Sequence, residues 1–163
     1  MKTAIIYATK HGTTEKVAHL IAEKIADNEI KIFNLKKDKK IPLASFDAFI
    51  IGTAVYAGLP INVINDFYKI ISGNLLGKKL GLFVCGMEQN VEKQQLEISN
   101  AFHSDLLNVA VAKAFCGGEF YFDKMNFLER MIVHSSAKTN KNVSEINYAN
   151  IDKFVEDWKN AKL

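Results

Sequence analysis

Hydrophobic residues occur along this chain as short continuous runs that alternate with longer, helically spaced segments. Continuous apolar runs at 4–8, 46–52 and 80–84 are typical of strands that are covered on both faces. The segment 29–35 alternates less cleanly and predicts an outer strand, and 109–115 predicts a further one. The pattern therefore predicts five strands separated by helical segments.

The segments between these strands carry apolar residues three and four positions apart, which is the spacing of a helix with one buried face. They predict helices over 13–27, 91–102 and 150–162, and another that begins at Pro60. Proline suits the first turn of a helix, where its missing N–H costs no hydrogen bond. Strands that alternate with helices form parallel sheets with right-handed crossovers, so we expect an α/β fold with helices on both faces.

The composition is that of an ordinary globular protein. Of the 163 residues, 48% are hydrophobic, 24% are charged and 2 are proline, so we expect one domain over 1–163 without linkers. The apolar start of the chain is too short for a signal peptide, and no later stretch is long enough to span a bilayer. With Cys85 and Cys116 as the only cysteines, the sequence favours a reducing cytoplasm and buried, inert thiols.

The net charge of +3 is a mild basic excess, and no run resembles a nucleic-acid arm, so no nucleic-acid partner is predicted. The histidines lack metal-ligand spacing and there is no Cys-x-x-Cys, so no metal site is predicted either. The simplest interpretation of the lysine clusters is a solvated surface, and the alternative is weak attraction to an anionic membrane or a carboxylate-bearing ligand. These clusters are Lys36, Lys37, Lys39 and Lys40, and Lys78 with Lys79.

Three loops leave the carboxyl ends of predicted strands, at 9–14, 53–58 and 85–90. Parallel sheets bind ligands beyond those ends, at the point where the strand order reverses. Each loop carries glycine or hydroxyl residues, which suit close approach and hydrogen bonding. The sequence therefore predicts a ligand site at this edge of the sheet.

The first of these loops is Thr9-Lys10-His11-Gly12-Thr13-Thr14. A helix that starts here offers unpaired N–H groups and a partial positive charge to an anion, and the threonine hydroxyls add donors. The loop lacks the Gly-Lys-Ser/Thr ending of an ATPase P-loop and the three glycines of a dinucleotide turn. Two interpretations remain at this point: a phosphate site, or a threonine-rich helix cap.

The pattern Thr-x-x-Gly-Thr-Thr after an apolar strand resembles the phosphate loop of the flavodoxin family, which holds FMN. The stretch Gly52-Thr53-Ala54-Val55-Tyr56-Ala57-Gly58 resembles the second flavin loop, and Val84-Cys85-Gly86-Met87 falls where the third would be. The resemblance covers essentially the whole chain. It implies a flavodoxin-like doubly wound sheet of five parallel strands in the order 2-1-3-4-5, with FMN as the cofactor.

The same resemblance implies the residues that border the cofactor. The phosphate would be surrounded by Thr9, Lys10, His11, Gly12, Thr13 and Thr14. One side of the isoalloxazine ring would be bordered by Thr53, Ala54, Val55, Tyr56, Ala57 and Gly58, and the other by Cys85, Gly86 and Met87. No catalytic side chain is assigned, because the flavin carries the chemistry. Flavodoxins often stack an aromatic residue of the third loop on the ring, whereas here Tyr56 is the only obvious loop aromatic.

An extra apolar segment at about 119–145 separates the last predicted strand from the last helix. It is similar to a segment of the flavodoxin-like menaquinone-dependent protoporphyrinogen oxidases. The shared elements are Tyr121 to Phe127, Glu129-Arg130 before Met131-Ile132-Val133, and Glu145-Ile146-Asn147-Tyr148, while Ser135-Ser136-Ala137 replaces the expected glycine-rich turn.

This second resemblance implies an FMN-dependent oxidoreductase of haem biosynthesis that oxidises protoporphyrinogen IX and passes electrons to a quinone at the inner face of the cell membrane. Tyr56, Met87 and 121–133 would shape the substrate face. The propionates would meet Lys124, Arg130 or Lys138.

Other interpretations of the same residues stay open. The apolar stripe at 125–133 is either an ordinary helix packed on the sheet or a lid beside the flavin. The protein as a whole is alternatively a soluble electron-transfer flavodoxin that serves a redox partner protein, or a flavin-free binding domain. The sequence does not predict an oligomeric state.

Overall fold

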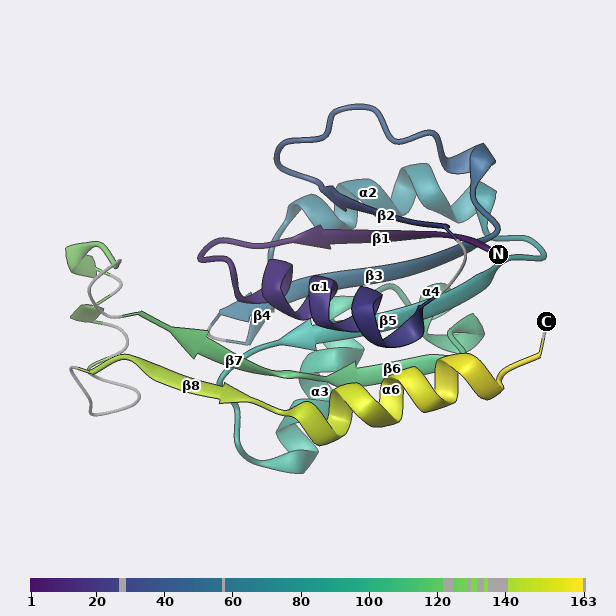
Figure 1. The fold of residues 1–163 in the computed structure, drawn as a ribbon. Helices are drawn as coiled ribbons and strands as arrows, with labels where there is room; N and C mark the ends of the chain where they lie inside the picture. The colour runs from purple at the N-terminus through teal and green to yellow at the C-terminus, as the bar shows by residue number, and fades with distance from the viewer. Residues whose placement is uncertain are drawn as a thin grey trace.

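The computed structural model describes residues 1–26, 29–56, 58–121, 125–128, 130–131, 134 and 141–162. Parallel strands form a central sheet in the order β2-β1-β3-β5-β6, which confirms the doubly wound order predicted for the five main strands (Figure 1). These strands are β1 (Lys2–Ala8), β2 (Glu29–Asn34), β3 (Ala48–Tyr56), β5 (Lys79–Cys85) and β6 (Ala112–Phe115).

Helices cover both faces of this sheet, as the alternation of elements predicts. One face is covered by α1 (Thr13–Ile25) and α6 (Tyr148–Asn160), which lie in front of the sheet in Figure 1. The other face is covered by α2 (Val63–Ile71), α3 (Val91–Ala101) and α4 (Ser104–Val109). Short 3₁₀ turns lie at η1 (Leu43–Ser45) and η2 (Ser72–Asn74). In the described part of the chain, no helix combines the length and apolar character needed to cross a membrane.

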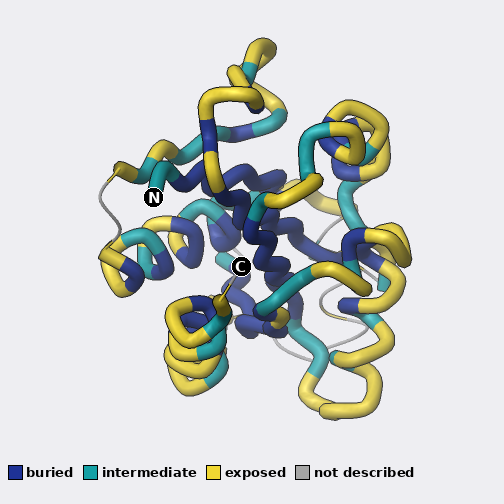
Figure 2. The backbone as a smooth tube through the Cα atoms, turned by 90° about the vertical axis from the view of Figure 1, so that its right-hand side faces the viewer, coloured by how far each residue is buried: buried dark blue, intermediate teal, exposed yellow. Residues whose placement is uncertain are grey.

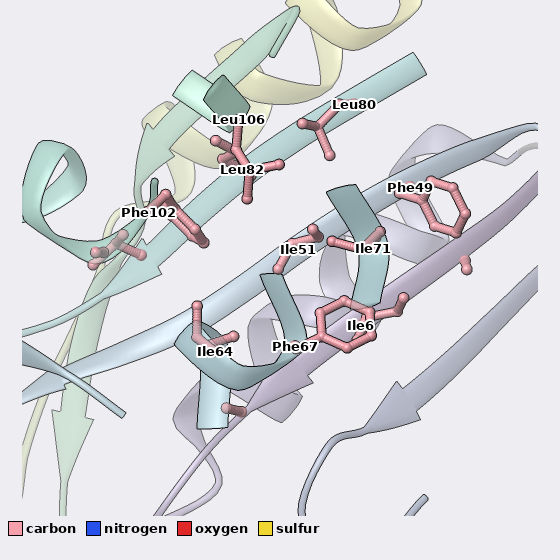
Figure 3. Packing of buried hydrophobic residues seen from close by; sticks show 14 of the residues in the cluster. Ile6, Phe49, Ile51, Ile64, Phe67, Ile71, Leu80, Leu82, Phe102 and Leu106 are labelled. Atoms are coloured by element: carbon pink, nitrogen blue, oxygen red, sulfur yellow. The ribbon is translucent and has the colours of Figure 1, made fainter. Parts of the chain in front are cut away.

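The core consists of two layers, one on each side of the sheet. Figure 2 shows the buried strands at the centre and the exposed outer sides of the helices around them. On the α2 side, Ile6 and Ile51 of the strands share a cluster with Phe67 and Ile71 of the helix (Figure 3). Burial of each such side chain contributes roughly 1.5–3 kcal/mol. The continuous apolar runs of the sequence are therefore explained by strands that are packed on both faces.

The register of the sheet brings the predicted ligand loops together. Ala8 at the end of β1 pairs with Thr53 of β3, and Ala54 of β3 pairs with Cys85 at the end of β5. The chain therefore leaves these three strands at neighbouring positions of one edge, and this carboxyl edge is where the candidate site must be sought.

Two predicted boundaries are wrong at the second loop. β3 continues to Tyr56, beyond the predicted strand end at Gly52, and pairs antiparallel with β4 (Leu59–Pro60). Residues Thr53 to Tyr56 are therefore strand and not loop. Pro60 lies in β4 and α2 begins only at Val63, so Pro60 is not in the first turn of a helix. A strand at the margin of a sheet tolerates proline, because no further strand needs a hydrogen bond from the N–H that proline lacks.

The structure also corrects the last predicted strand and adds a hairpin. Val109 ends α4, and β6 begins only at Ala112. Beyond β6, β7 (Gly117–Phe120) pairs antiparallel with β8 (Val143–Ile146), and the pair projects past the carboxyl edge of the main sheet (Figure 1). The extra segment predicted at about 119–145 thus begins and ends in this β7–β8 hairpin. We did not predict either strand.

Candidate functional site

The first loop closes on itself between β1 and α1. Gly12 has φ +97, the left-handed region that favours glycine, and its N–H donates to Thr9 Oγ1 over 3.0 Å. Gly12 is also the N-cap residue of α1 and has no side chain to cap it, and none of the other described side chains accepts a hydrogen bond from the first N–H groups of the helix. The threonines therefore do not serve as a side-chain cap. The first N–H groups of α1 have no partner within the helix and remain available to a ligand.

Thr13 and Thr14 are buried at the start of α1, but their hydroxyls meet different neighbours. Thr13 Oγ1 donates to the Glu119 carbonyl over 3.1 Å. Thr14 Oγ1 faces the Cys85 thiol, which is a weak partner, and forms no well-formed hydrogen bond within the described residues. A buried hydroxyl without a good partner beside an uncapped helix start suits a ligand that carries acceptor oxygens.

Tyr7 supports this corner from below the loop. It is buried near the end of β1, and its pKa is raised to about 12, first by burial and then by hydrogen bonding to Glu15. Tyr7 therefore stays protonated.

The second predicted loop meets the first at Tyr56. The rings of His11 and Tyr56 lie edge to face with their centroids 5.7 Å apart, and Lys10 Nζ lies 5.8 Å from the Tyr56 ring centroid. Tyr56 remains 40% exposed. The structure thus places an accessible aromatic ring beside the first loop, at the carboxyl edge.

Other residues of the second loop are less accessible. Thr53, Ala54 and Val55 are buried in β3, and Thr53 Oγ1 donates to the Ala54 carbonyl over 3.2 Å. Gly58 adopts φ +78, and a side chain there would meet open space. Ala57 lies outside the described residues. Of the residues predicted to border a ring on this side, Tyr56 and Gly58 are the described ones at the surface.

The third loop can present backbone groups and the Met87 thioether to a ligand. The Cys85 side chain packs in the core beneath α1, and burial raises the pKa of its thiol to about 12. Cys116 is buried as well, and burial raises its thiol pKa well above the usual range. Both thiols are protonated and shielded, which agrees with the prediction of inert cysteines. Met87 is partly exposed, so it and the Gly86 backbone are what the third loop can present.

The hairpin packs on this third loop through backbone contacts and through Gln89, whose side-chain amide donates to the Glu145 carboxylate. The Gly86 N–H donates to the Gly117 carbonyl over 3.1 Å. Gly117 has φ +70, and a Cβ there would overlap the Glu145 carbonyl, while a Cβ on Gly118 would lie 2.7 Å from the Gly86 oxygen. The Gly117-Gly118 pair therefore permits β7 to pass directly against the carboxyl edge.

Glu119 of β7 is a buried carboxylate beside the first loop that the sequence reasoning missed. Its side chain is 3% exposed and lies 2.7 Å from Lys16 Nζ of α1. Ser144 Oγ of β8 donates to the same carboxylate oxygen over 2.6 Å, and the Tyr121 hydroxyl donates to the other over 3.2 Å. No local signal in the sequence marks Glu119 as buried, because its partners Lys16 and Ser144 lie far from it along the chain.

A cavity of about 420 Å³ lies between the third loop and the hairpin. Its lining includes Met87, Gln89, Phe115, Glu145 and Tyr148. Of the residues predicted to border a cofactor, only Gly86 and Met87 line it, and the first loop does not. This cavity is therefore adjacent to the site at the first loop and distinct from it.

The segment predicted to form a lid is described only in part. Met125 is buried, whereas Phe127, Leu128 and Met131 are exposed. The Arg130 side chain donates through Nε to the Met125 carbonyl over 3.0 Å. The predicted propionate contacts Lys124 and Lys138 lie outside the described residues, as do Glu129, Ile132 and Val133 and the Ser135-Ser136-Ala137 turn.

Solved structures of flavodoxins share this fold over the full length of the chain. A short-chain flavodoxin associated with a PDU bacterial microcompartment is 17% identical with a TM-score of 0.63, and the alignment covers 98% of this chain and 97% of that one. Oxidised flavodoxin 1 from Bacillus cereus is 18% identical with a TM-score of 0.58, over 99% and 100% of the two chains. Rubredoxin:oxygen oxidoreductase from Desulfovibrio gigas is 14% identical with a TM-score of 0.55, over 97% of this chain and 34% of that one.

No curated protein sequence matches the chain. A protein-family comparison does match, and it covers residues 4–147, from β1 to the end of the hairpin. The match therefore includes the first loop, the second and third loops and Glu119. On this basis the chain belongs to the flavodoxin domain family.

Proposed function

We propose that this protein binds FMN at the carboxyl edge and serves as an electron-transfer flavoprotein. The observation that carries the proposal is the uncapped start of α1 at Gly12, beside the buried Thr14 hydroxyl that lacks a good partner. These groups suit the phosphate of FMN, because a helix N-terminus stabilises a dianion and each spare donor adds a hydrogen bond. Membership of the flavodoxin family supports the same cofactor.

Different residues would bind the phosphate and the isoalloxazine ring of FMN. The phosphate would be held by the N–H groups at the start of α1 and by the hydroxyls of Thr9 and Thr14, with Lys10 nearby as a cation. The Tyr56 ring would lie against the isoalloxazine, and Met87 would border its other side. The bound flavin supplies electron uptake and release. The protein orients it and excludes water from its inner edge.

An absorption spectrum of the freshly purified protein, followed by titration with FMN and with riboflavin, tests this proposal. We expect a flavin spectrum or saturable binding, with FMN bound more tightly than riboflavin because only FMN carries the phosphate. A colourless protein that ignores both ligands would contradict the proposal and would favour the flavin-free binding domain.

The positive charge of a lysine cluster near the carboxyl edge supports an acidic redox partner protein. The Leu35 N–H donates to the Tyr7 carbonyl over 2.9 Å, so the lysine cluster that follows begins beside the end of β1. Within the described chain, the four ammonium groups of this cluster form no ion pair, although Asp38 lies among them and accepts from the Asn34 N–H. Clustered charge near a redox centre steers an oppositely charged partner. The cluster consists of Lys36, Lys37, Lys39 and Lys40.

A more specific function has support from the exposed segment after β7. Phe127 is 76% exposed, and Leu128 and Met131 are also exposed. Apolar side chains of this kind suit a flat porphyrinogen, a quinone or the surface of the cell membrane. On this proposal the protein removes hydride equivalents from protoporphyrinogen IX and passes the electrons to a quinone, with Arg130 near the propionates.

Anaerobic assay of the flavin-loaded protein with protoporphyrinogen and a quinone analogue tests the specific function. Porphyrin formation that depends on the quinone would support it. Bound flavin without turnover would contradict it and would leave the electron carrier as the function. The carrier itself is tested by reductive titration and by electron exchange with a flavodoxin reductase.

A further inference from the structure

We propose that Glu119 is a positioning residue for the FMN phosphate, because it fixes the β7–β8 hairpin against the first turn of α1. This inference rests on the proposed function. It concerns a carboxylate on the hairpin, outside the three loops that the family resemblance implies.

The Glu119 side chain joins three separate elements. Lys16 comes from α1, Ser144 from β8 and Tyr121 from the chain just after β7, and each donates to the carboxylate. Lys16 and Ser144 share Oε1 at 2.7 and 2.6 Å, and Tyr121 bonds Oε2 at 3.2 Å. Charge-assisted bonds of this length are stronger than neutral ones, so this carboxylate determines how the hairpin sits on the helix.

The backbone of the same residue contacts the phosphate loop directly. The Glu119 carbonyl accepts the Thr13 hydroxyl over 3.1 Å, and Thr13 immediately follows Gly12. On its other side, β7 is held to the third loop through Gly86 and Gly117. The strand is therefore fixed from both sides, and the carboxylate fixes the side that faces the predicted phosphate.

The energetics of this carboxylate depend on its partners. Burial by itself would raise the pKa of Glu119, but hydrogen bonds from Lys16 and Ser144, together with the Lys16 charge, hold the pKa below its usual range. A buried charge persists only when it is paired and hydrogen-bonded. The ion pair also prevents Glu119 from acting as an isolated negative charge beside a phosphate.

The contacts of Glu119 lie on the phosphate side of the site and not on the ring side. The residues that it holds, Thr13 and Lys16, belong to the first turn of α1, whereas the accessible ring is Tyr56 of β3. Loss of the network should therefore alter recognition of the phosphate and leave recognition of the isoalloxazine unchanged. The ratio of riboflavin to FMN dissociation constants measures this difference, because riboflavin lacks the phosphate.

The test compares Glu119→Gln with Glu23→Gln, an equal charge change at an exposed position later in the same helix. We expect Glu119→Gln to weaken FMN binding by about tenfold, the value of roughly one hydrogen bond, and to leave riboflavin binding within about twofold. The Glu23→Gln control should change neither constant. Thermal unfolding and circular dichroism of both variants report whether the fold is intact.

A second variant approaches the same ion pair from α1. Lys16→Met should weaken FMN binding by a similar factor, and the double variant should be no weaker than either single one, because both remove the same interaction. Additive losses would indicate that Lys16 contacts the phosphate independently and would overturn the role given to Glu119.

Three other results would also overturn the inference. Tighter FMN binding by Glu119→Gln would identify the carboxylate as a repulsive charge. Equal weakening of FMN and riboflavin would reduce it to a structural residue. If the wild type binds both flavins and Glu119→Gln changes neither dissociation constant, the inference alone is rejected. A wild-type protein that binds neither flavin would reject the proposed function with it.

Discussion

The imidazole of His11 meets the ring of Tyr56 edge to face, so the first ligand loop rests against the only aromatic residue of the second. The contact joins the residue before Gly12 to the end of β3. A cofactor that occupies both loops would have its charged group and its ring fixed by one packed unit. The accessible part of Tyr56 is then available for the ring of the cofactor.

Replacement of Tyr56 tests this arrangement. Tyr56→Ala should weaken FMN and riboflavin binding equally, by about twofold to twelvefold, because an aromatic stack contributes roughly 0.5–1.5 kcal/mol. Tyr56→Phe keeps the ring and should bind both flavins as the wild type does. Titration followed by flavin fluorescence measures both constants. A loss confined to FMN would show that Tyr56 acts through the phosphate loop instead.

Gly12→Val should abolish measurable FMN binding while the fold survives. A Cβ at Gly12 meets open space, so the cost in the free protein is the strain of a left-handed backbone, about 1–2 kcal/mol. The added side chain would occupy the space that the phosphate needs and would shift the N–H groups beside it.

The matched control for Gly12→Val is Gly77→Val. Gly77 also has a positive φ, +70, and also faces open space, but it lies in the turn before β5, at the other end of the sheet. It should lose similar stability and keep its flavin affinity. Retained tight binding by Gly12→Val would show that the phosphate lies elsewhere.

Glu97 predicts a pH dependence of stability. Its Oε2 is buried in α3 without a hydrogen-bond partner among the described residues, and its pKa is raised by burial and then by the Glu88 charge. Because the folded protein favours the neutral form of Glu97, the protonated carboxyl contributes to the free energy of unfolding. This contribution is complete below the unfolded-state pKa and is lost as the pH rises through the folded-state pKa. The wild type should therefore lose stability relative to Glu97→Gln as the pH rises above the ordinary glutamate pKa of about 4.3.

Chemical denaturation of both proteins across this pH range measures the effect. Glu92→Gln changes an exposed carboxylate on the same helix and is the control. If the difference in free energy of unfolding between the wild type and Glu97→Gln stays constant across the range, ionisation of Glu97 does not destabilise the fold and the prediction is wrong.

The exposed residues after β7 separate the two proposed functions. Phe127→Ser with Leu128→Ser should leave FMN affinity unchanged and reduce quinone-linked porphyrinogen oxidation by about tenfold, because these residues are exposed and lie outside the flavin loops. Leu76→Ser, at a side chain that is 97% exposed before β5, is the control for lost surface hydrophobicity. Equal turnover in all three proteins would assign the segment no part in the reaction.

The main sheet could be predicted because its strands are packed on both faces. Runs such as Phe49 to Ile51 are apolar at every position, and two helical layers explain why. The errors lie where tertiary pairing overrides local pattern. Pro60 has the local character of a helix start, but its pairing with Val55 places it in a strand. Val109 continues an apolar run, yet it belongs to a short helix that the chain needs before β6.

The first loop could be predicted from residue type, and the hairpin could not. Gly12 is the residue type that favours a left-handed turn, and the predicted loop lies at the edge where parallel strands end. Glu119 gives no such signal, because a lone glutamate is normally exposed and its burial depends on Lys16, which lies 103 positions away. The hydrophobic periodicity of the sequence is a local property and does not report pairing between residues so far apart.

The antiparallel ladder of β7 and β8 has a consequence for engineering. Phe120 stands opposite Val143, so the chain leaves β7 and enters β8 at paired positions. Exposed residues between the two strands, such as Phe127 and Leu128, can accordingly be exchanged while Tyr121, whose hydroxyl bonds Glu119, is kept. On the proposed function, specificity for a partner or substrate could then be altered at these positions without a change in the parallel sheet.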